Sequence, residues 1–204
     1  MPPLVQLPTV PRAFYNRDPR IVGRELLGKV LLRREGRALL AGRIVECEAY
    51  LGPEDPAAHA ASGKTARNAV LFGPPGYAYV YFIYGNHWCL NVSCLPDGTP
   101  GGLLFRALEP LAGIPRMAAN RHLEPSQLRL IASGPGRLSE ALAITRPRDN
   151  AKDLTSPKSD LRIVDDGFRP DAIRESPRIG IRKAMDLPLR YTIANSPYIS
   201  AKRP

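Results

Sequence analysis

Apolar and polar residues alternate with a period of two along much of this chain, and that period is typical of β-strands. Strands are expected at 30–34, 38–50, 77–84, 87–95, 102–108, 161–164, 178–181 and 189–194. Glu35-Gly36 separates the first two, and Gly85-Asn86 separates the aromatic pair. Gly-Asn is a signal for a two-residue hairpin, because glycine readily takes the positive φ that such a turn needs. The pattern therefore predicts two antiparallel hairpins.

Helix signals lie between these strands. Asp18-Pro19 provides an N-cap and a first-turn proline, and Gly28 ends the helix that they begin. Further helices are expected at 55–63, 110–120, 125–132 and 133–144, with a loop at 146–160. Strands mostly follow strands, and helices mostly follow helices. This order favours an α+β fold, in which helices flank a curved, mostly antiparallel sheet and one hairpin protrudes.

The chain has 204 residues, enough for one domain with a substantial core. Four prolines in residues 1–12 predict a flexible N-terminal arm, which leaves 13–204 as a single domain. Lysine and arginine number 29 against 19 acidic residues, so the net charge is +10. Such a balance indicates a polyanionic partner, nucleic acid before a membrane surface, although a generally basic surface gives the same count.

Cysteine and histidine usage predicts a reduced, metal-free protein. Cys47, Cys89 and Cys94 lie in or beside apolar strands and form no Cys-x-x-Cys pair, as expected of buried thiols in the cytoplasm. The three histidines lack metal-ligand spacing. No apolar run approaches the ~20 residues of a membrane span, and the first residues lack the features of a secretion signal.

Candidate chemistry begins in the strand at 38–50. Alternation places Glu46, Glu48 and Tyr50 on one face, with Cys47 on the other. A carboxylate beside an apolar wall can serve as a general base for water. A solvent-exposed strand face is nevertheless the commoner place for glutamate, and this segment alone favours that interpretation.

Arg106 lies inside the apolar strand at 102–108. A buried arginine needs an acceptor, because an unpaired buried charge is costly, and Glu46 and Glu48 are the obvious partners. The pair could be a structural ion pair, or Arg106 could hold a catalytic carboxylate ionised.

The aromatic hairpin carries three tyrosines on one face, Tyr77, Tyr79 and Tyr81. An aromatic face is more often core than binding site, but buried tyrosine hydroxyls need partners. Three together therefore indicate a pocket that could stack a flat aromatic ligand, with Asn91 offering amide hydrogen bonds. Tyr84 lies at the hairpin tip, where it could act as a wedge in a base stack.

Taken together, these segments resemble the alkyladenine (3-methyladenine) DNA glycosylase family. The matching stretches are 42–55, 57–59, 65–68, 79–85, 89–93, 104–110, 133–135 and 178–181. They run in order along almost the whole chain, and several unrelated short motifs match with compatible spacing.

The resemblance implies roles for individual residues. Glu48 corresponds to the general base that activates water, with Arg106 and the main-chain carbonyl of Ile179 as further ligands of that water. The implied walls of the pocket for an extruded base are Tyr50, His59 and Tyr81, and Asn91 corresponds to the residue that rejects purines with a 2-amino group. Tyr84 corresponds to the residue that fills the gap in the duplex. The implied further DNA contacts are Leu71, Thr65, Arg121 and Arg137.

The implied function is that of a monofunctional glycosylase. It would release alkylated or deaminated purines, of the 3-methyladenine, 7-methylguanine, hypoxanthine and ethenoadenine class, from double-stranded DNA. We expect a cytoplasmic bacterial monomer without cofactor or metal. Two alternatives stay open: a non-catalytic protein that binds damaged DNA or RNA through an aromatic pocket, and a hydrolase of free nucleosides. The second would need neither Tyr84 nor the excess charge.

Overall fold

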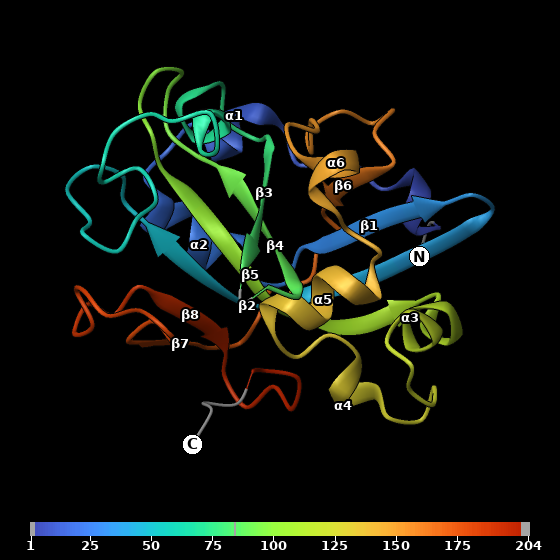
Figure 1. Ribbon diagram of the computed structural model, residues 1–204. Coiled ribbons are helices and arrows are strands. Elements are labelled where there is room, and N and C mark those ends of the chain that lie inside the picture. Colours follow the sequence, from blue (N-terminus) through green and yellow to red (C-terminus); the bar gives the residue numbers. More distant parts are fainter. Residues whose placement is uncertain (1–2, 84, 201–204) are drawn as a thin grey trace.

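An antiparallel β-sheet curls through the centre of the molecule (Figure 1). The computed structural model describes residues 3–83 and 85–200, and within them the sheet has eight strands. These are β1 Val30–Glu35, β2 Ala38–Tyr50, β3 Ala78–Ile83, β4 His87–Ser93, β5 Gly102–Ala112, β6 Leu161–Val164, β7 Ile173–Ser176 and β8 Arg190–Ile193. The main order is β3-β4-β5-β2-β1-β6, and β8 pairs with both β2 and β7. Both predicted hairpins, β1–β2 and β3–β4, are confirmed, but Ile83 pairs with His87, so three residues connect β3 and β4 instead of the predicted two.

The long strand β2 organises this sheet. One of its edges pairs with β5, while the other pairs first with β1 and then, at 46–48, with β8. Register shifts interrupt the β2–β5 ladder near Ala41 and between Ile44 and Cys47. Such bulges bend a strand and increase its twist. They therefore help the sheet to curl.

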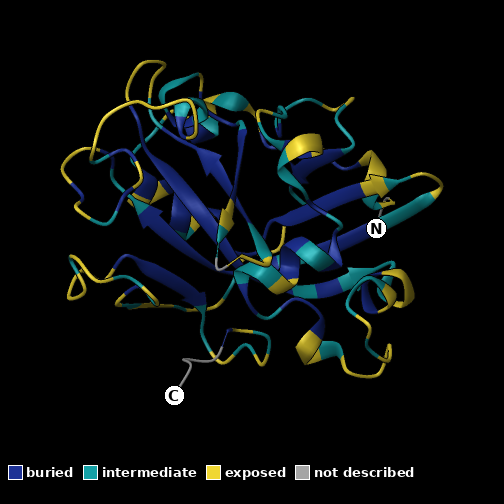
Figure 2. Ribbon diagram, in the orientation of Figure 1, coloured by how far each residue is buried: buried dark blue, intermediate teal, exposed yellow. Residues whose placement is uncertain are grey.

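Six α-helices and two short 3₁₀ helices lie in the described residues. They are α1 Arg12–Tyr15, α2 Pro19–Leu26, α3 Ile114–Asn120, α4 Leu128–Ile131, α5 Pro135–Ala141 and α6 Arg146–Asp149, with η1 Leu4–Gln6 and η2 Ala69–Phe72. The predicted start of α2 is confirmed, because the Asp18 side chain accepts a hydrogen bond from the Arg20 N–H. The α+β class is confirmed as well. Figure 2 shows that the sheet is buried along most of its length, whereas loops and turns are exposed.

Several predicted boundaries are wrong. Residues 55–63 form turns instead of a helix, and 178–181 form no strand; β7 lies at 173–176 instead. The Ile179 N–H donates to the Glu48 side chain, so it is not available for a β-ladder. The strand β5 continues through Ala112, so the next helix starts later than predicted. The expected loop at 146–160 contains the one-turn helix α6.

Residues 3–11, part of the expected flexible arm, pack along the edge strand β6. Leu7 and Val10 are buried, and the Val10 N–H donates to the Ile163 carbonyl at 2.9 Å. The Asp165 N–H in turn donates to the Pro8 carbonyl at 3.1 Å. Apolar anchors and backbone hydrogen bonds therefore hold this proline-rich segment against the sheet.

Candidate active site

A cavity of about 1110 Å³ lies against the half of the sheet formed by β2, β3, β4 and β5. The turn segment at 57–60, the start of α5 at 133–137 and the loop at 177–183 supply most of the remaining lining. The strands contribute tyrosines, Asn91 and Arg106, so the wall combines aromatic and other apolar side chains with a few polar groups. This composition is typical of a small-molecule or base-binding site.

The β-bulges decide which side chains of β2 face this cavity. Leu40 and Ile44, at even positions, pack in the main core cluster, and so do Cys47 and Ala49, at odd positions. The alternate residues that face the core therefore switch from even to odd positions between Ile44 and Cys47. The register shift in the β2–β5 ladder lies at the same place. Glu46 and Glu48 thereby lie on the side of β2 away from the main core, where most of their partners, but not the two glutamates themselves, line the cavity.

Glu48 is fully buried, and all its hydrogen-bond partners line the cavity. Its Oε1 accepts from the Ile179 N–H at 2.8 Å and lies 3.1 Å from an Arg106 nitrogen. Its Oε2 accepts from the Tyr50 hydroxyl at 3.0 Å. Burial raises the pKa of Glu48, and these three partners offset the rise only in part. The solvent-exposed face that this segment alone favours is wrong.

Glu46 forms the centre of a polar cluster that shares Arg106 with Glu48. Its Oε1 accepts from Arg106 at 2.9 Å, from Arg190 at 2.7 Å and from the Ser200 hydroxyl at 2.7 Å. The Ser200 N–H donates to the other carboxylate oxygen. Arg106 therefore bridges the two carboxylates, as its place in an apolar strand predicts. Burial opposes the Arg106 charge, but Glu48 and Glu46 outweigh it and raise the pKa of Arg106.

Tyr79, Tyr81 and His59 form one aromatic wall. The His59 and Tyr81 ring centroids are 4.5 Å apart in an edge-to-face arrangement, and His59 Nδ1 lies 2.9 Å from the Tyr79 hydroxyl. Burial, together with the positive charge of Arg67, lowers the pKa of His59. The imidazole is therefore neutral over a wider pH range than an exposed histidine.

Asn91 and Leu71 lie on the same lining. The Asn91 amide donates to the Tyr79 carbonyl at 3.2 Å, and Leu71 packs in the cluster formed by Tyr79, Tyr81, Cys89 and Leu104. Leu71 is 7% exposed. Its predicted contact with DNA would therefore involve a nucleotide inside the cavity.

The other predicted DNA contacts occupy different places. Arg137 is exposed and lines the cavity, whereas Thr65 is exposed on a neighbouring loop. Arg121 pairs with Glu140 and is not part of the cavity lining. Tyr84 lies outside the described residues, between Ile83 on the cavity wall and Gly85, whose φ is +74°.

The structure adds site residues that sequence reasoning did not single out. Tyr79 is not one of them, because the predicted face of Tyr77, Tyr79 and Tyr81 includes it; Tyr79 and Tyr81 do line the cavity, whereas Tyr77 is not part of the lining. Asp55 and Arg178 form a buried ion pair beside Tyr50. They are 123 positions apart, so no local pattern in the sequence connects them.

No group of three His, Cys, Asp or Glu side chains within residues 3–83 and 85–200 has the geometry of a metal site. No helix in these ranges has the length and apolar character needed to cross a bilayer.

Comparison with known proteins gives consistent matches over nearly the whole chain. The model of the methylpurine-DNA glycosylase family matches residues 13–197. A protein of Koribacter versatilis named "Putative 3-methyladenine DNA glycosylase" is 80% identical over 98% of this chain and 97% of its own length. Proteins with the same name from Burkholderia cenocepacia and Methanoculleus marisnigri are 49% and 45% identical, over 96% and 95% of this chain. They are covered over 92% and 100% of their own lengths.

These matches include β2 with its two carboxylates, the β3–β4 hairpin, Arg106 on β5 and the loop that contains Ile179. The fold, the aromatic cavity and the family comparison therefore agree. This chain belongs to the methylpurine-DNA glycosylase family.

Proposed function

We propose that this protein is a hydrolytic DNA glycosylase that releases alkylated or deaminated purines from double-stranded DNA. The observation that carries the proposal is the position of Glu48, a buried carboxylate in direct contact with three residues of an aromatic cavity. Family membership and the names of the relatives support a glycosylase that acts on methylated purines. The net charge of +10 suits a DNA partner.

The cavity wall suits a purine taken out of the base stack. Tyr50, His59 and Tyr81 offer flat faces and edges, on which any purine can stack. Many N-alkylated purines carry a positive charge, which aromatic rings attract. The lowered pKa of His59 keeps that imidazole neutral, so it does not repel such a base.

Glu48 is the proposed general base. It accepts a proton from a water molecule, whose oxygen forms a bond to the sugar C1′ while the C1′–N bond breaks and its electron pair leaves with the base. The carboxylate also stabilises the positive charge that builds on the sugar. Arg106 and the main-chain carbonyl of Ile179 are the proposed partners of that water.

Two further residues have proposed roles, one in selecting the base and one in keeping it out of the duplex. Asn91 on the cavity wall would reject a purine with a 2-amino group, through a clash or a lost hydrogen bond. Tyr84 would occupy the space that the extruded nucleotide leaves in the duplex. Cationic alkylated purines are good leaving groups, whereas hypoxanthine would need a proton donor as well.

We further propose that the enzyme hydrolyses without cleaving the DNA strand. Strand cleavage by a glycosylase needs an amine nucleophile at C1′. Lys183, on the loop at 177–183, is the lysine among the described lining residues, and its side chain is exposed to solvent. The Glu48 cluster contains arginines instead, and these do not lose their protons.

The test is an assay on an end-labelled duplex that contains one 7-methylguanine, ethenoadenine or hypoxanthine. We expect strand cleavage at that position only after alkali, because hydrolysis leaves an abasic site. Glu48→Gln should retain binding to the lesion duplex and lose base release, whereas Glu25→Gln, the same change on α2, should be active. Binding without release by the wild-type protein would instead identify a non-catalytic damage-binding protein. Normal release by Glu48→Gln would remove Glu48 from the mechanism.

A further inference from the structure

Asp55 and Arg178 form a bidentate ion pair whose two side chains are completely buried. Arg178 donates to Asp55 Oδ2 at 2.5 Å and to Oδ1 at 2.8 Å. The Leu51 and Ala57 N–H groups also donate to this carboxylate. Burial alone would raise the pKa of Asp55, but these hydrogen bonds outweigh it and lower the pKa, so the pair stays charged.

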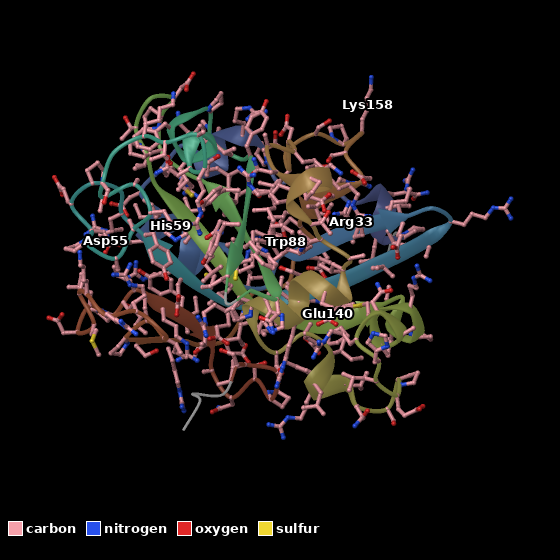
Figure 3. All side chains as sticks on the ribbon, viewed as in Figure 1. Arg33, Asp55, His59, Trp88, Glu140 and Lys158 are labelled. Carbon is pink, nitrogen blue, oxygen red and sulfur yellow. The ribbon has the colours of Figure 1, made fainter. Side chains whose placement is uncertain are left out.

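This ion pair joins two loops that both line the cavity. Asp55 lies in the turn segment between Tyr50 and His59, and Arg178 lies in the segment that ends in the exposed loop at 182–188. Figure 3 shows Asp55 on the same side of the molecule as His59. Since both loops line the cavity, the ion pair fixes how they are placed relative to each other.

The same arginine also touches the groups that hold Glu48. It donates to the Ala49 carbonyl at 3.0 Å, and its guanidinium lies 4.6 Å from the centroid of the Tyr50 ring. Its neighbour in the chain is Ile179, whose N–H donates to Glu48. Two of the three partners of Glu48 are therefore placed by contacts or by a peptide bond to Arg178.

Stability alone is a weak reason for such a pair. Burying two charges is costly, and well-packed apolar side chains of similar volume often serve the free energy of folding equally well. What an ion pair adds is a fixed bidentate geometry, since the planar guanidinium and the carboxylate match in one orientation.

We propose that Asp55 and Arg178 are positioning residues for the hydrolysis step. Their ion pair holds the Tyr50 hydroxyl and the Ile179 N–H in place on the Glu48 carboxylate. This inference rests on the proposed role of Glu48 as general base. It goes further by assigning the alignment of that base to a contact between two loops that are distant in the sequence.

The experiment compares Arg178→Lys and Asp55→Asn with Arg33→Lys and Asp149→Asn. The control pair is also fully buried, with 2.6 Å between Arg33 and Asp149, and Figure 3 shows Arg33 on the opposite side of the molecule from Asp55 and His59. Single-turnover release from a 7-methylguanine duplex reports the chemical step. The Kd for a duplex with a tetrahydrofuran abasic analogue measures the affinity for DNA when no base occupies the pocket.

We expect Arg178→Lys and Asp55→Asn to slow single-turnover release roughly 10- to 100-fold, because small displacements of a catalytic group have effects of this size. Their Kd for the abasic analogue should stay within about threefold of the wild-type value. A threefold change in Kd corresponds to less than half the binding free energy of a tenfold change. The control variants should lower the Tm and, under conditions where they are folded, release the base at the wild-type rate.

Three results would overturn the inference. The first is wild-type rates in folded Arg178→Lys and Asp55→Asn. The second is slowing that Arg33→Lys and Asp149→Asn share. The third is unfolding of both test variants while both controls stay folded, because the fold itself would then require the pair. A wild-type protein that releases no base would instead contradict the proposed function, and the same assay shows that outcome separately.

Discussion

Glu46 and Glu48 lie on one face of β2 but in different electrostatic surroundings. Glu46 accepts hydrogen bonds from two arginines and from both polar groups of Ser200, so its oxygens are fully engaged. Glu48 has one arginine, a phenol and a backbone N–H, and its pKa is raised by burial. Two carboxylates with different surroundings can take different roles. Glu46 holds Arg106, and this difference supports Glu48 as the proposed base.

The pH dependence of base release should report the Glu48 carboxyl. A base must be ionised, so the rate should fall about tenfold per pH unit below its pKa. That pKa lies above the ordinary value of 4.5, because burial is the largest influence on it. Single-turnover release of 7-methylguanine, which needs no leaving-group protonation, should therefore lose half its rate at a pH above 4.5. A constant rate down to that pH in folded protein would contradict the assignment.

Ionised Glu48 should also lower the free energy of unfolding at neutral pH. A carboxyl whose pKa is higher in the folded than in the unfolded state stabilises the fold below its unfolded pKa, and this contribution disappears as the pH rises through the folded pKa. Glu48→Gln should therefore have a Tm at pH 8 equal to or above that of the wild type, with Arg106 still paired to Glu46.

The control for that measurement is Glu175→Gln. A hydrogen bond from Arg24 lowers the pKa of Glu175, so the sign is opposite, and the substitution should lower the Tm slightly at pH 8. Thermal unfolding between pH 4 and pH 8 checks both variants. A large loss of Tm in Glu48→Gln at pH 8 would show that the ionised carboxylate stabilises the fold.

Much of the site's residue content could be predicted, because β-alternation brings Glu46, Glu48 and Tyr50 together and a buried arginine needs a carboxylate. The partner of Asp55 could not, since the ion pair depends on where two irregular loops meet. The Ile179 N–H contact could not be predicted from a side-chain pattern, because it is made by the backbone.

At the scale of secondary-structure elements, hairpins were predictable and bulges were not. Gly85 and Gly36 mark tight turns between alternating strands, and both have positive φ. No local sequence pattern predicts that the core-facing residues of β2 switch from even to odd positions. The switch arises from how β2 pairs with β5, about 60 residues away in the chain. The apolar alternation at Ile179 and Ile181 resembles a strand, yet contacts with Glu48 and Asp55 determine the local conformation. Tertiary contacts override a short pattern here.

Tyr84 is predicted to act at the tip of the β3–β4 hairpin. Replacing it with alanine should weaken base extrusion, because the vacated position in the duplex is no longer filled. The Tm should change little, since a tip residue adds little to a core. Fluorescence of 2-aminopurine beside the lesion reports extrusion, and thermal unfolding reports stability. Severe unfolding of Tyr84→Ala would place the ring in the core instead.

The loop that carries His59 should depend on Asn68. This buried amide donates to the His59 carbonyl at 2.8 Å and to the Gly63 carbonyl at 3.0 Å, and it accepts from the Thr65 N–H. Asn68→Ala leaves these groups unpaired and should cost roughly 1–3 kcal/mol of unfolding free energy. Lesion binding should also weaken, because His59 loses its support.

Asn120→Ala provides the matched control for Asn68→Ala. Its amide donates to the Ala141 carbonyl at 3.0 Å, and neither residue lines the cavity. We expect some loss of stability in chemical denaturation and unchanged affinity for the lesion duplex. Equal affinities in Asn68→Ala and Asn120→Ala would show that the loop keeps its shape without Asn68.

At the scale of the whole molecule, some basic side chains are paired with carboxylates and others are exposed. Arg24, Arg33, Arg43, Arg106 and Arg178 are paired with carboxylates. Arg137, Arg182 and Lys183, by contrast, are exposed and line the cavity. This distribution places unneutralised charge where a DNA backbone would approach a base held in the pocket.

The salt dependence of DNA binding tests that distribution. Each phosphate contact contributes about −0.9 to the slope of log K against log salt concentration. Arg182→Ala with Lys183→Ala should therefore make the slope less steep by about 2. The double variant Arg37→Ala with Lys158→Ala removes two exposed cations elsewhere, Lys158 on the side away from His59 (Figure 3), and should leave the slope unchanged. Equal slopes in both double variants would place the DNA on another surface.

The carboxylate cluster around Glu46 gathers residues from the whole length of the chain. Its partners lie 60, 144 and 154 positions further along, at Arg106, Arg190 and Ser200. A ribosome delivers the N-terminal part first, so the aromatic wall and Arg106 emerge well before Arg190 and Ser200 do. A nascent chain halted before Ser200 would carry a surface for DNA but an unfinished acid cluster. The Glu46 carboxylate therefore gains its full set of partners only once the chain has been synthesised as far as Ser200.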